Sequence, residues 1–259
     1  MVLSSFTSII NSYLPEPHAS LLNGILFGVN LQSGKEFYEQ LRVVGLLHLV
    51  VLSGINITLL VSITTEITQY FGKPISILIT ILTVILFILF VGAKAPIIRA
   101  GFMGILTLVA ILYGRKNIAL YSLFLSLIFI SLFWPRWLTS VSLQLSYGAT
   151  LGIILFGTSS SQNSLWKEFK TSLAAQVFTV PIIFIYFKQI SFIAPLSNLL
   201  VAFTIYPLMI FGFLTAFLGK IHHVLGIIPS FICYGLLQYM VFVIEHLSKI
   251  PFVYFNFAR

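Results

Sequence analysis

The sequence predicts an all-α fold, a polytopic bundle of transmembrane helices, and three observations support this prediction. Apolar residues make up 59% of the chain, and the mean hydropathy is +1.07. Only 8% of the residues are charged, against about 25% in soluble domains. Apolar runs near 20 residues long follow one another along the chain, and about 20 apolar residues cross a bilayer as a helix. We therefore expect roughly eight hydrophobic spans, some of them broken or re-entrant, and an N-terminal amphipathic helix at the membrane interface.

Residues 1–43 form the predicted interfacial segment, and residues 44–259 form the predicted transmembrane domain. The apolar stretch Ala19–Gly28 is too short to span a bilayer. Glu36–Val44 has the pattern of an amphipathic helix, with one apolar face formed by Phe37, Leu41 and Val44. The N-terminus lacks the basic region and long apolar core of a cleaved signal peptide, so we expect the first span to insert and remain.

The spans themselves are separated by short polar or aromatic turns. We expect them at residues 44–63, 75–93, 96–114, 118–134, 138–157, 170–188, 190–217 and 224–247. Pro195 and Pro207 bracket the seventh span, and we expect that span to be broken at membrane depth, as in helices that mark a translocation path. Lysine and arginine divide almost evenly between the two sides of such a bundle, so the positive-inside rule assigns no orientation.

Composition also restricts the classes of function. The chain has no aspartate, six glutamates and one cysteine, Cys233. This argues against carboxylate pairs for acid–base catalysis, Asp-dependent triads and cysteine metal clusters, so we expect no enzyme, no metal and no cofactor. The net charge of +8 has two interpretations: basic residues that meet anionic lipid at the interface, or basic residues that attract a polyanion such as nucleic acid.

The most informative polar residues lie inside the first span, in the segment from His48 to Asn56. His48, Ser53, Gly54 and Asn56 stand there among Leu, Val and Ile. A polar group without a partner in hydrocarbon costs about 2–7 kcal/mol, so these side chains should face the protein interior or water. Helix packing explains Ser53 and Gly54 as well as a function does, whereas the buried imidazole and amide favour a function.

A second group surrounds Pro96, a residue suited to the first turn of a helix. Lys94 precedes that turn and Arg99 falls within it, where the helix dipole disfavours a cation. A nearby anion such as phosphate would resolve this conflict. The competing explanation is an arginine that extends to lipid headgroups.

Two further groups place amides in apolar runs. Gln144 and Ser146 precede the Gly148-x-x-x-Gly152 pattern, which is typical of close helix packing. Packing accounts for the glycines but less well for the amide. Gln176 and Asn198 are similar amides, in the sixth and seventh spans.

Together these segments resemble the competence domain of the ComEC family, the inner-membrane DNA-uptake channel of transformable bacteria. The resemblance rests on four segments in the same order: Gly45–Asn56, Pro96–Ala100, Leu143–Thr150 and Pro195–Leu199. It covers about Pro15 to Ile250. The larger family members also carry an N-terminal soluble domain and a metallo-β-lactamase-like domain, and this chain shows neither pattern.

The resemblance implies a multi-pass protein of the cytoplasmic membrane that passes single-stranded DNA. It also implies contact with lipid and with other competence proteins, among them a DNA receptor and a cytoplasmic motor, and it leaves a homo-oligomer open. Arg99 and Lys94 would meet phosphates. The other residues expected along the path are His48, Ser53, Gly54, Asn56, Gln144, Ser146, Gln176 and Asn198. Two alternatives stay open: a secondary transporter for a small anion, and a scaffold that only assembles competence proteins.

Overall fold

The computed structural model describes residues 2–29, 31, 34–47, 54–115, 118–157, 164–250 and 254–256. It confirms the helical fold class. The α-helices are α1 (Val2–Tyr13), α2 (His18–Phe27), α3 (Lys35–Val43), α5 (Gly54–Thr68), α6 (Lys73–Val91), α7 (Ala95–Leu112), α8 (Ala119–Phe133), α9 (Val141–Phe156), α10 (Ser164–Phe187), α11 (Ala194–Ile221) and α12 (His223–Ser248). Two short 3₁₀ helices, η1 (Gln69–Phe71) and η2 (Pro135–Thr139), and two strands, β1 (Gln189–Ser191) and β2 (Tyr254–Asn256), complete the described elements.

The structure corrects the number of full-length spans. By length and composition, five of the described helices can cross a membrane: α6, α7, α10, α11 and α12. Helices α8 and α9 lie where spans were predicted but contain only 15 and 16 residues. At 1.5 Å per residue they reach about 23 Å, less than the hydrocarbon thickness of about 30 Å. Apolar runs include the turn residues at each end of a helix, which is why the runs overestimate its length.

The break expected in the seventh span is absent. Helix α11 runs without interruption for 28 residues, with Pro195 in its first turn and Pro207 in its interior. A proline in the first turn removes no helical hydrogen bond. An interior proline removes one, and membrane helices tolerate that loss when neighbouring groups satisfy the freed carbonyl.

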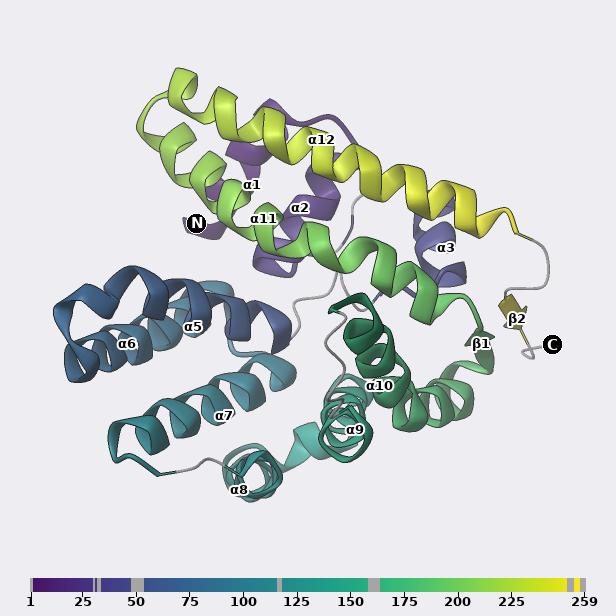
Figure 1. Cartoon of the computed structure of the whole chain (residues 1–259). Helices are drawn as coiled ribbons and strands as arrows, with labels where there is room; N and C mark the ends of the chain where they lie inside the picture. The colour runs from purple at the N-terminus through teal and green to yellow at the C-terminus, as the bar shows by residue number, and fades with distance from the viewer. Residues whose placement is uncertain are drawn as a thin grey trace. The chain divides into compact units, whose positions relative to one another are not determined.

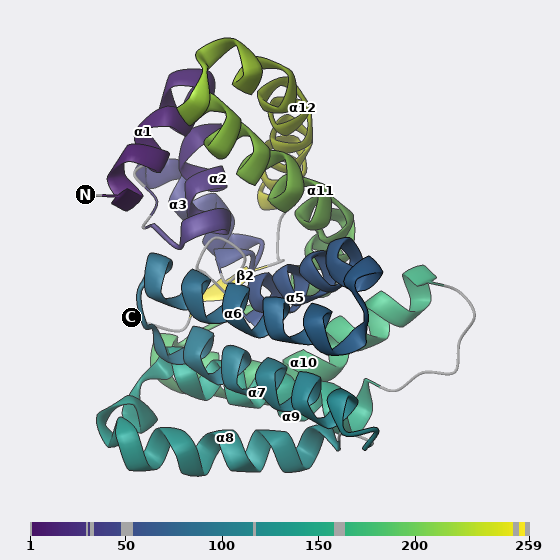
Figure 2. The same ribbon diagram turned by 90° about the vertical axis from the view of Figure 1, so that its left-hand side faces the viewer.

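The described chain divides into two compact units, and each is described by itself. Unit 1 comprises residues 1–52 and 187–259, and unit 2 comprises residues 53–186. In unit 1, α11 and α12 pack as a long hairpin against α1, α2 and α3 (Figures 1 and 2). All ten residues of α2 are buried, and Gly212 of α11 lets Leu22 and Leu26 approach. The short α2 is therefore a core element of unit 1.

Helix α3 confirms the predicted amphipathic helix. Phe37, Leu41 and Val44 are all buried, and the helix packs on α12. Arg42 forms an ion pair with Glu39 at 3.4 Å, and its Nε donates to Oε1 of Gln189 at the start of β1. Strands β1 and β2, which the apolar pattern did not predict, pair antiparallel beside this contact.

Unit 2 is a helical bundle in which α7 packs against α5, α6, α8 and α9 (Figure 2). Side-chain contacts define the directions of its helices. Phe102 of α7 stacks on Phe129 of α8, with ring centroids 4.5 Å apart, so these two helices are antiparallel. Gly54 of α5 lies beside Arg99 and Ala100 of α7, while Ile57 approaches Gly104. Helices α5 and α7 therefore run in the same direction.

The glycines of α9 serve packing, as their spacing predicts. A Cβ atom at Gly148 would meet Ile182 and Phe178 of α10, and one at Gly152 would collide with the backbone oxygen of Ala174. Because the glycine side chain is a single hydrogen atom, α9 and α10 can approach each other closely at these two positions.

We expect Gly152→Ala to lower the apparent melting temperature of the detergent-purified protein. The added methyl group would overlap a backbone carbonyl that cannot rotate away, at a cost of about 1–3 kcal/mol. The matched control is Gly235→Ala in α12, where the new methyl group would have no atom of another described part of the chain within 4 Å. Equal melting temperatures for the two variants would contradict the close approach of α9 and α10.

Candidate functional site

Arg99 forms the centre of the candidate site in unit 2. It lies in the second turn of α7, after an extended N-cap residue, Lys94, and a first turn that contains Pro96. Its exposed fraction is only 5%. The prediction that Pro96 lies in the first turn of a helix is confirmed, whereas Arg99 lies in the second turn and not in the first. The burial of Arg99 argues against an arginine extended to lipid headgroups.

The partners of this guanidinium are neutral. Nε of Arg99 donates to Oγ of Ser146 at 3.0 Å, and Nη1 contacts Sδ of Met103 at 3.3 Å. The Tyr147 ring lies 5.5 Å from Cζ, within the range of a cation–π interaction. The hydroxyl of Tyr147 pairs in turn with buried Ser126 of α8 at 2.9 Å. The ring is thus held between α7, α8 and α9.

A buried arginine normally has a carboxylate beside it, and here none is found among the residues that the structure describes. The one ion pair in the described ranges joins Arg42 to Glu39, in unit 1. Arginine carries five N–H donors, and no described residue accepts a hydrogen bond from Nη2 of Arg99. The site therefore offers a desolvated positive charge with donor capacity left for an anion.

Gly54 allows α5 to approach this charge. A Cβ atom at residue 54 would lie 3.2 Å from Nη2 of Arg99 and 3.2 Å from Cβ of Ala100. Two residues later on α5, Asn56 is buried with an exposed fraction of 3%. The structure therefore brings the end of the first polar segment to the second and third segments, through Gly54, Arg99 and Ser146.

The other predicted residues of unit 2 lie at different places. Lys94 is exposed at the same end of α7 as Arg99. Gln144 is half-buried in the first turn of α9 and donates to the carbonyl of Leu138 at 3.2 Å, so its amide has a local structural partner. Gln176 is half-buried in α10, between Ala174, which lies against Gly152, and Phe178, which lies against Gly148.

The fourth segment belongs to unit 1, where it meets the start of the first. The buried hydroxyl of Ser197 donates to the carbonyl of Val44 at 2.7 Å. Gly45 has a φ of +75°, and a Cβ atom there would lie 2.6 Å from that of Ala194. Asn198 follows on the same turn of α11 and is half-buried. Backbone conformation and close approach together explain this glycine.

His48 and Ser53 lie outside the described residues, so their predicted roles stay predictions. The first segment nevertheless contributes its two ends to different units, with Gly45 in unit 1 and Gly54 in unit 2.

Sequence reasoning did not assign three contacts that the structure shows. Met103 stands four residues after Arg99 on the same helix face, a spacing that could have indicated the contact. Tyr147 follows Ser146 directly, but only the folded bundle shows its ring beside the guanidinium. Ser197 lies in the fourth segment, Pro195–Leu199, and the residue that accepts its hydrogen bond, Val44, is 153 residues away in the chain.

Comparison with known proteins gives a consistent result. A model of the Competence protein family matches residues 25–259. The chain is similar to "ComE operon protein 3" of Bacillus subtilis (strain 168), with 27% identity over 208 residues that cover 76% of this chain and 26% of that protein. It is also similar to an "Uncharacterized protein" of Aquifex aeolicus (strain VF5), with 31% identity over 156 residues that cover 60% of this chain and 36% of that protein. The matches thus span about a quarter to a third of each relative's length, and no solved structure matches the chain.

The uncompensated charge of Arg99 generates a prediction about stability. We expect Arg99→Met to leave the apparent melting temperature unchanged or to raise it, because an apolar side chain of similar length removes a buried cation that has no ion-pair partner among the described residues. The matched control is Arg42→Met, which removes an ion pair and the hydrogen bond to Gln189. The control should lower the free energy of unfolding by about 1–2 kcal/mol.

Thermal unfolding of both variants in one detergent provides the comparison. A larger loss of stability for Arg99→Met than for Arg42→Met would show that Arg99 is a structural residue and would argue against an anion site.

Proposed function

The chain belongs to the Competence protein family, and on this premise we propose that it forms a membrane channel that carries single-stranded DNA across the cytoplasmic membrane during natural transformation. The family match over residues 25–259 covers α3 and all later described helices, and five of these helices are long and apolar enough to span a membrane. The similarity to ComE operon protein 3 of Bacillus subtilis also supports a role in competence.

The observation that carries the proposal is the buried guanidinium of Arg99. A DNA strand that crosses hydrocarbon needs cations for its phosphates and polar groups around them. Arg99 supplies the cation in the interior of unit 2, where its partners are a hydroxyl, a sulfur and an aromatic ring. A phosphate can displace such neutral partners, whereas an aspartate or glutamate would compete with it for the guanidinium.

The arrangement around Arg99 suits a strand that passes from the surface inward. Lys94 is exposed at the end of α7 where that helix begins, and Arg99 is buried one turn further along. Two cations at one end of a helix would draw a phosphate from water toward the interior. Because residue 54 is glycine, position 54 of α5 places no side chain against Nη2 of Arg99.

We propose transport without catalysis, because the six glutamates and the absence of aspartate leave little material for acid–base chemistry. Passage of a strand then depends on an energy source elsewhere, and we propose a soluble motor in the cytoplasm and a DNA receptor on the opposite side as partners. One observation also favours a second candidate, a transporter for a small anion: a single buried guanidinium whose described partners are all neutral can bind one inorganic phosphate.

The test uses liposomes that contain the purified chain and external, fluorescently labelled single-stranded DNA. We expect the wild-type chain to make part of the DNA resistant to added nuclease. Arg99→Gln should reduce this protected fraction at least tenfold, since one charge-assisted contact in an apolar site is worth about 1.5–3 kcal/mol. Arg99→Lys should restore only part of the activity, because lysine lacks the planar fork that binds phosphate in two places.

The matched control is Lys73→Gln, which removes an exposed cation at the N-terminus of α6, the opposite end of unit 2 from Lys94. It should transport DNA at the wild-type rate. Uptake of labelled inorganic phosphate without uptake of DNA would favour the anion transporter. Equal uptake of DNA by the wild type and Arg99→Gln would remove Arg99 from the path.

A further inference from the structure

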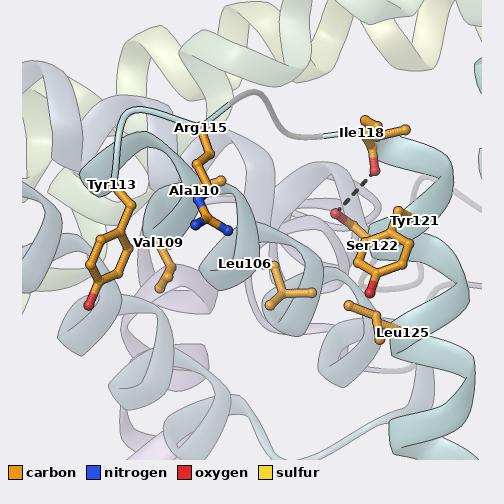
Figure 3. A pocket seen from close by; sticks show the side chains of 9 residues that line it. All are labelled: Leu106, Val109, Ala110, Tyr113, Arg115, Ile118, Tyr121, Ser122 and Leu125. Atoms are coloured by element: carbon orange, nitrogen blue, oxygen red, sulfur yellow. Dashed lines mark hydrogen bonds between the residues drawn. The ribbon is translucent and has the colours of Figure 1, made fainter.

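A second cationic site lies at the other end of α7, in a cavity that the proposed DNA path does not use. The cavity has a volume of about 460 Å³ and lies between the C-terminal half of α7 and the N-terminal half of α8 (Figure 3). Its size is within the range of about 300–1,000 Å³ that is usual for small-molecule sites. We infer that this cavity binds one anionic phospholipid, with the phosphate at Arg115 and part of an acyl chain between the two helices.

The shape of the cavity follows from how α7 and α8 pack. Near the start of α7 the helices touch, with the rings of Phe102 and Phe129 stacked 4.5 Å apart. Toward the turn that joins the helices, the walls of the cavity separate them. The two helices are therefore in contact near the start of α7 and are separated by the cavity near the turn that joins them.

The walls suit an acyl chain. Aliphatic side chains from both helices line the space: Leu106, Val109 and Ala110 from α7, and Leu125 from α8. The outer surface of α8 is also apolar, with Leu120 and Phe124 exposed by 46% and 58%. In a membrane protein, acyl chains cover such a surface, so the cavity is continuous with an environment that already contains lipid.

The mouth suits a headgroup. In Figure 3 the Arg115 side chain extends from the turn to a position beside Ala110, while Tyr121 and Ser122 stand on the α8 wall. Tyr113 and Tyr121 are 74% and 62% exposed, as expected for tyrosines at the level of headgroups. None of the described residues that line the cavity is a carboxylate, and the guanidinium has no ion pair with any residue that the structure describes.

A simpler explanation accounts for the arginine alone. Gly114, with a φ of +65°, ends α7, and the N–H of Arg115 donates to the carbonyl of Ala110 at 2.8 Å. A cation just beyond a helix C-terminus interacts favourably with the helix dipole. That interaction needs neither the cavity nor the two exposed tyrosines, and an anionic lipid uses all three features.

A nucleic acid fits this cavity less well than a lipid does. A strand needs polar groups along its path and several cations, whereas the described lining offers one arginine against mainly aliphatic walls. The inference does not rest on the proposed transport of DNA, since lipid binding can be measured in its absence.

The experiment is native mass spectrometry of the purified chain, titrated with phosphatidylglycerol or with phosphatidylcholine of the same acyl chains. We expect the chain to retain phosphatidylglycerol preferentially. Arg115→Gln should weaken this binding about fivefold, because one basic residue contributes about 1 kcal/mol toward an anionic headgroup, and it should leave phosphatidylcholine unaffected. Arg136→Gln is the matched control, since it removes an exposed arginine from η2 at the other end of α8, and it should bind as the wild type does.

A second variant tests the cavity without a change of charge. Ala110→Phe places a ring in the space between α7 and α8 and should weaken the binding of both lipids. Equal effects of Arg115→Gln and Arg136→Gln, or no effect of either variant in the cavity, would overturn the inference.

Two competitors identify other occupants. Glycerol phosphate, which has the headgroup chemistry without acyl chains, should not displace the lipid. A single-stranded oligonucleotide should not displace it either. Displacement by glycerol phosphate would make the cavity a site for free phosphate, and displacement by the oligonucleotide would make it a nucleic-acid site. Either result would overturn the assignment to lipid.

Discussion

A peptide group in hydrocarbon finds no hydrogen-bond partner outside its own chain, and this constraint shapes both units of the protein. The apolar runs become helices because a helix satisfies its own N–H and carbonyl groups. The small-residue contacts follow from the same constraint. Since lipid offers little hydrophobic gain from helix association, close approach at positions such as Gly152 and Gly212 supplies the packing. Prolines within α10, α11 and α12 are accommodated without ending these helices.

Arg99 is exceptional against this apolar background. Its charge is buried, its described neighbours are neutral, and three helices contribute to its surroundings: α5 through Gly54, α9 through Ser146 and Tyr147, and α7 itself. Tyr147 is restrained by Ser126, which keeps the ring in position beside the cation. Such a site differs from a salt bridge, because an incoming anion would complete it and would not have to displace a carboxylate. This distinction connects the geometry to the proposed transport of a polyanion.

Unit 2 places cations of two kinds at opposite ends of α7. At one end Lys94 is exposed and Arg99 is buried. At the other end Arg115 stands over an open apolar cavity beside two exposed tyrosines. The two arginines thus have different surroundings. Arg99 is buried and hydrogen-bonded to Ser146, whereas Arg115 lies at the opening of the apolar cavity. Burial and the nature of the neighbours, which charge counting does not capture, separate the two roles.

The sequence alone determined the helical membrane class, the approximate positions of α6 to α12, the amphipathic α3 and the packing glycines of α9. These features depend on local periodicity and composition, which act over a few turns. It overestimated the number of full-length spans, because an apolar run does not show where a helix ends, and it predicted a break in α11 that the fold does not contain. Only the tertiary structure decided which of the four polar segments meet: the start of the first segment meets the fourth, and the end of the first segment meets the second, which in turn meets the third. Gly45 meets the turn that holds Ser197, whereas Gly54 lies beside Arg99, and Arg99 donates a hydrogen bond to Ser146. These partners lie tens of residues or more apart in the chain, and their contact depends on how whole helices pack, which no local pattern specifies.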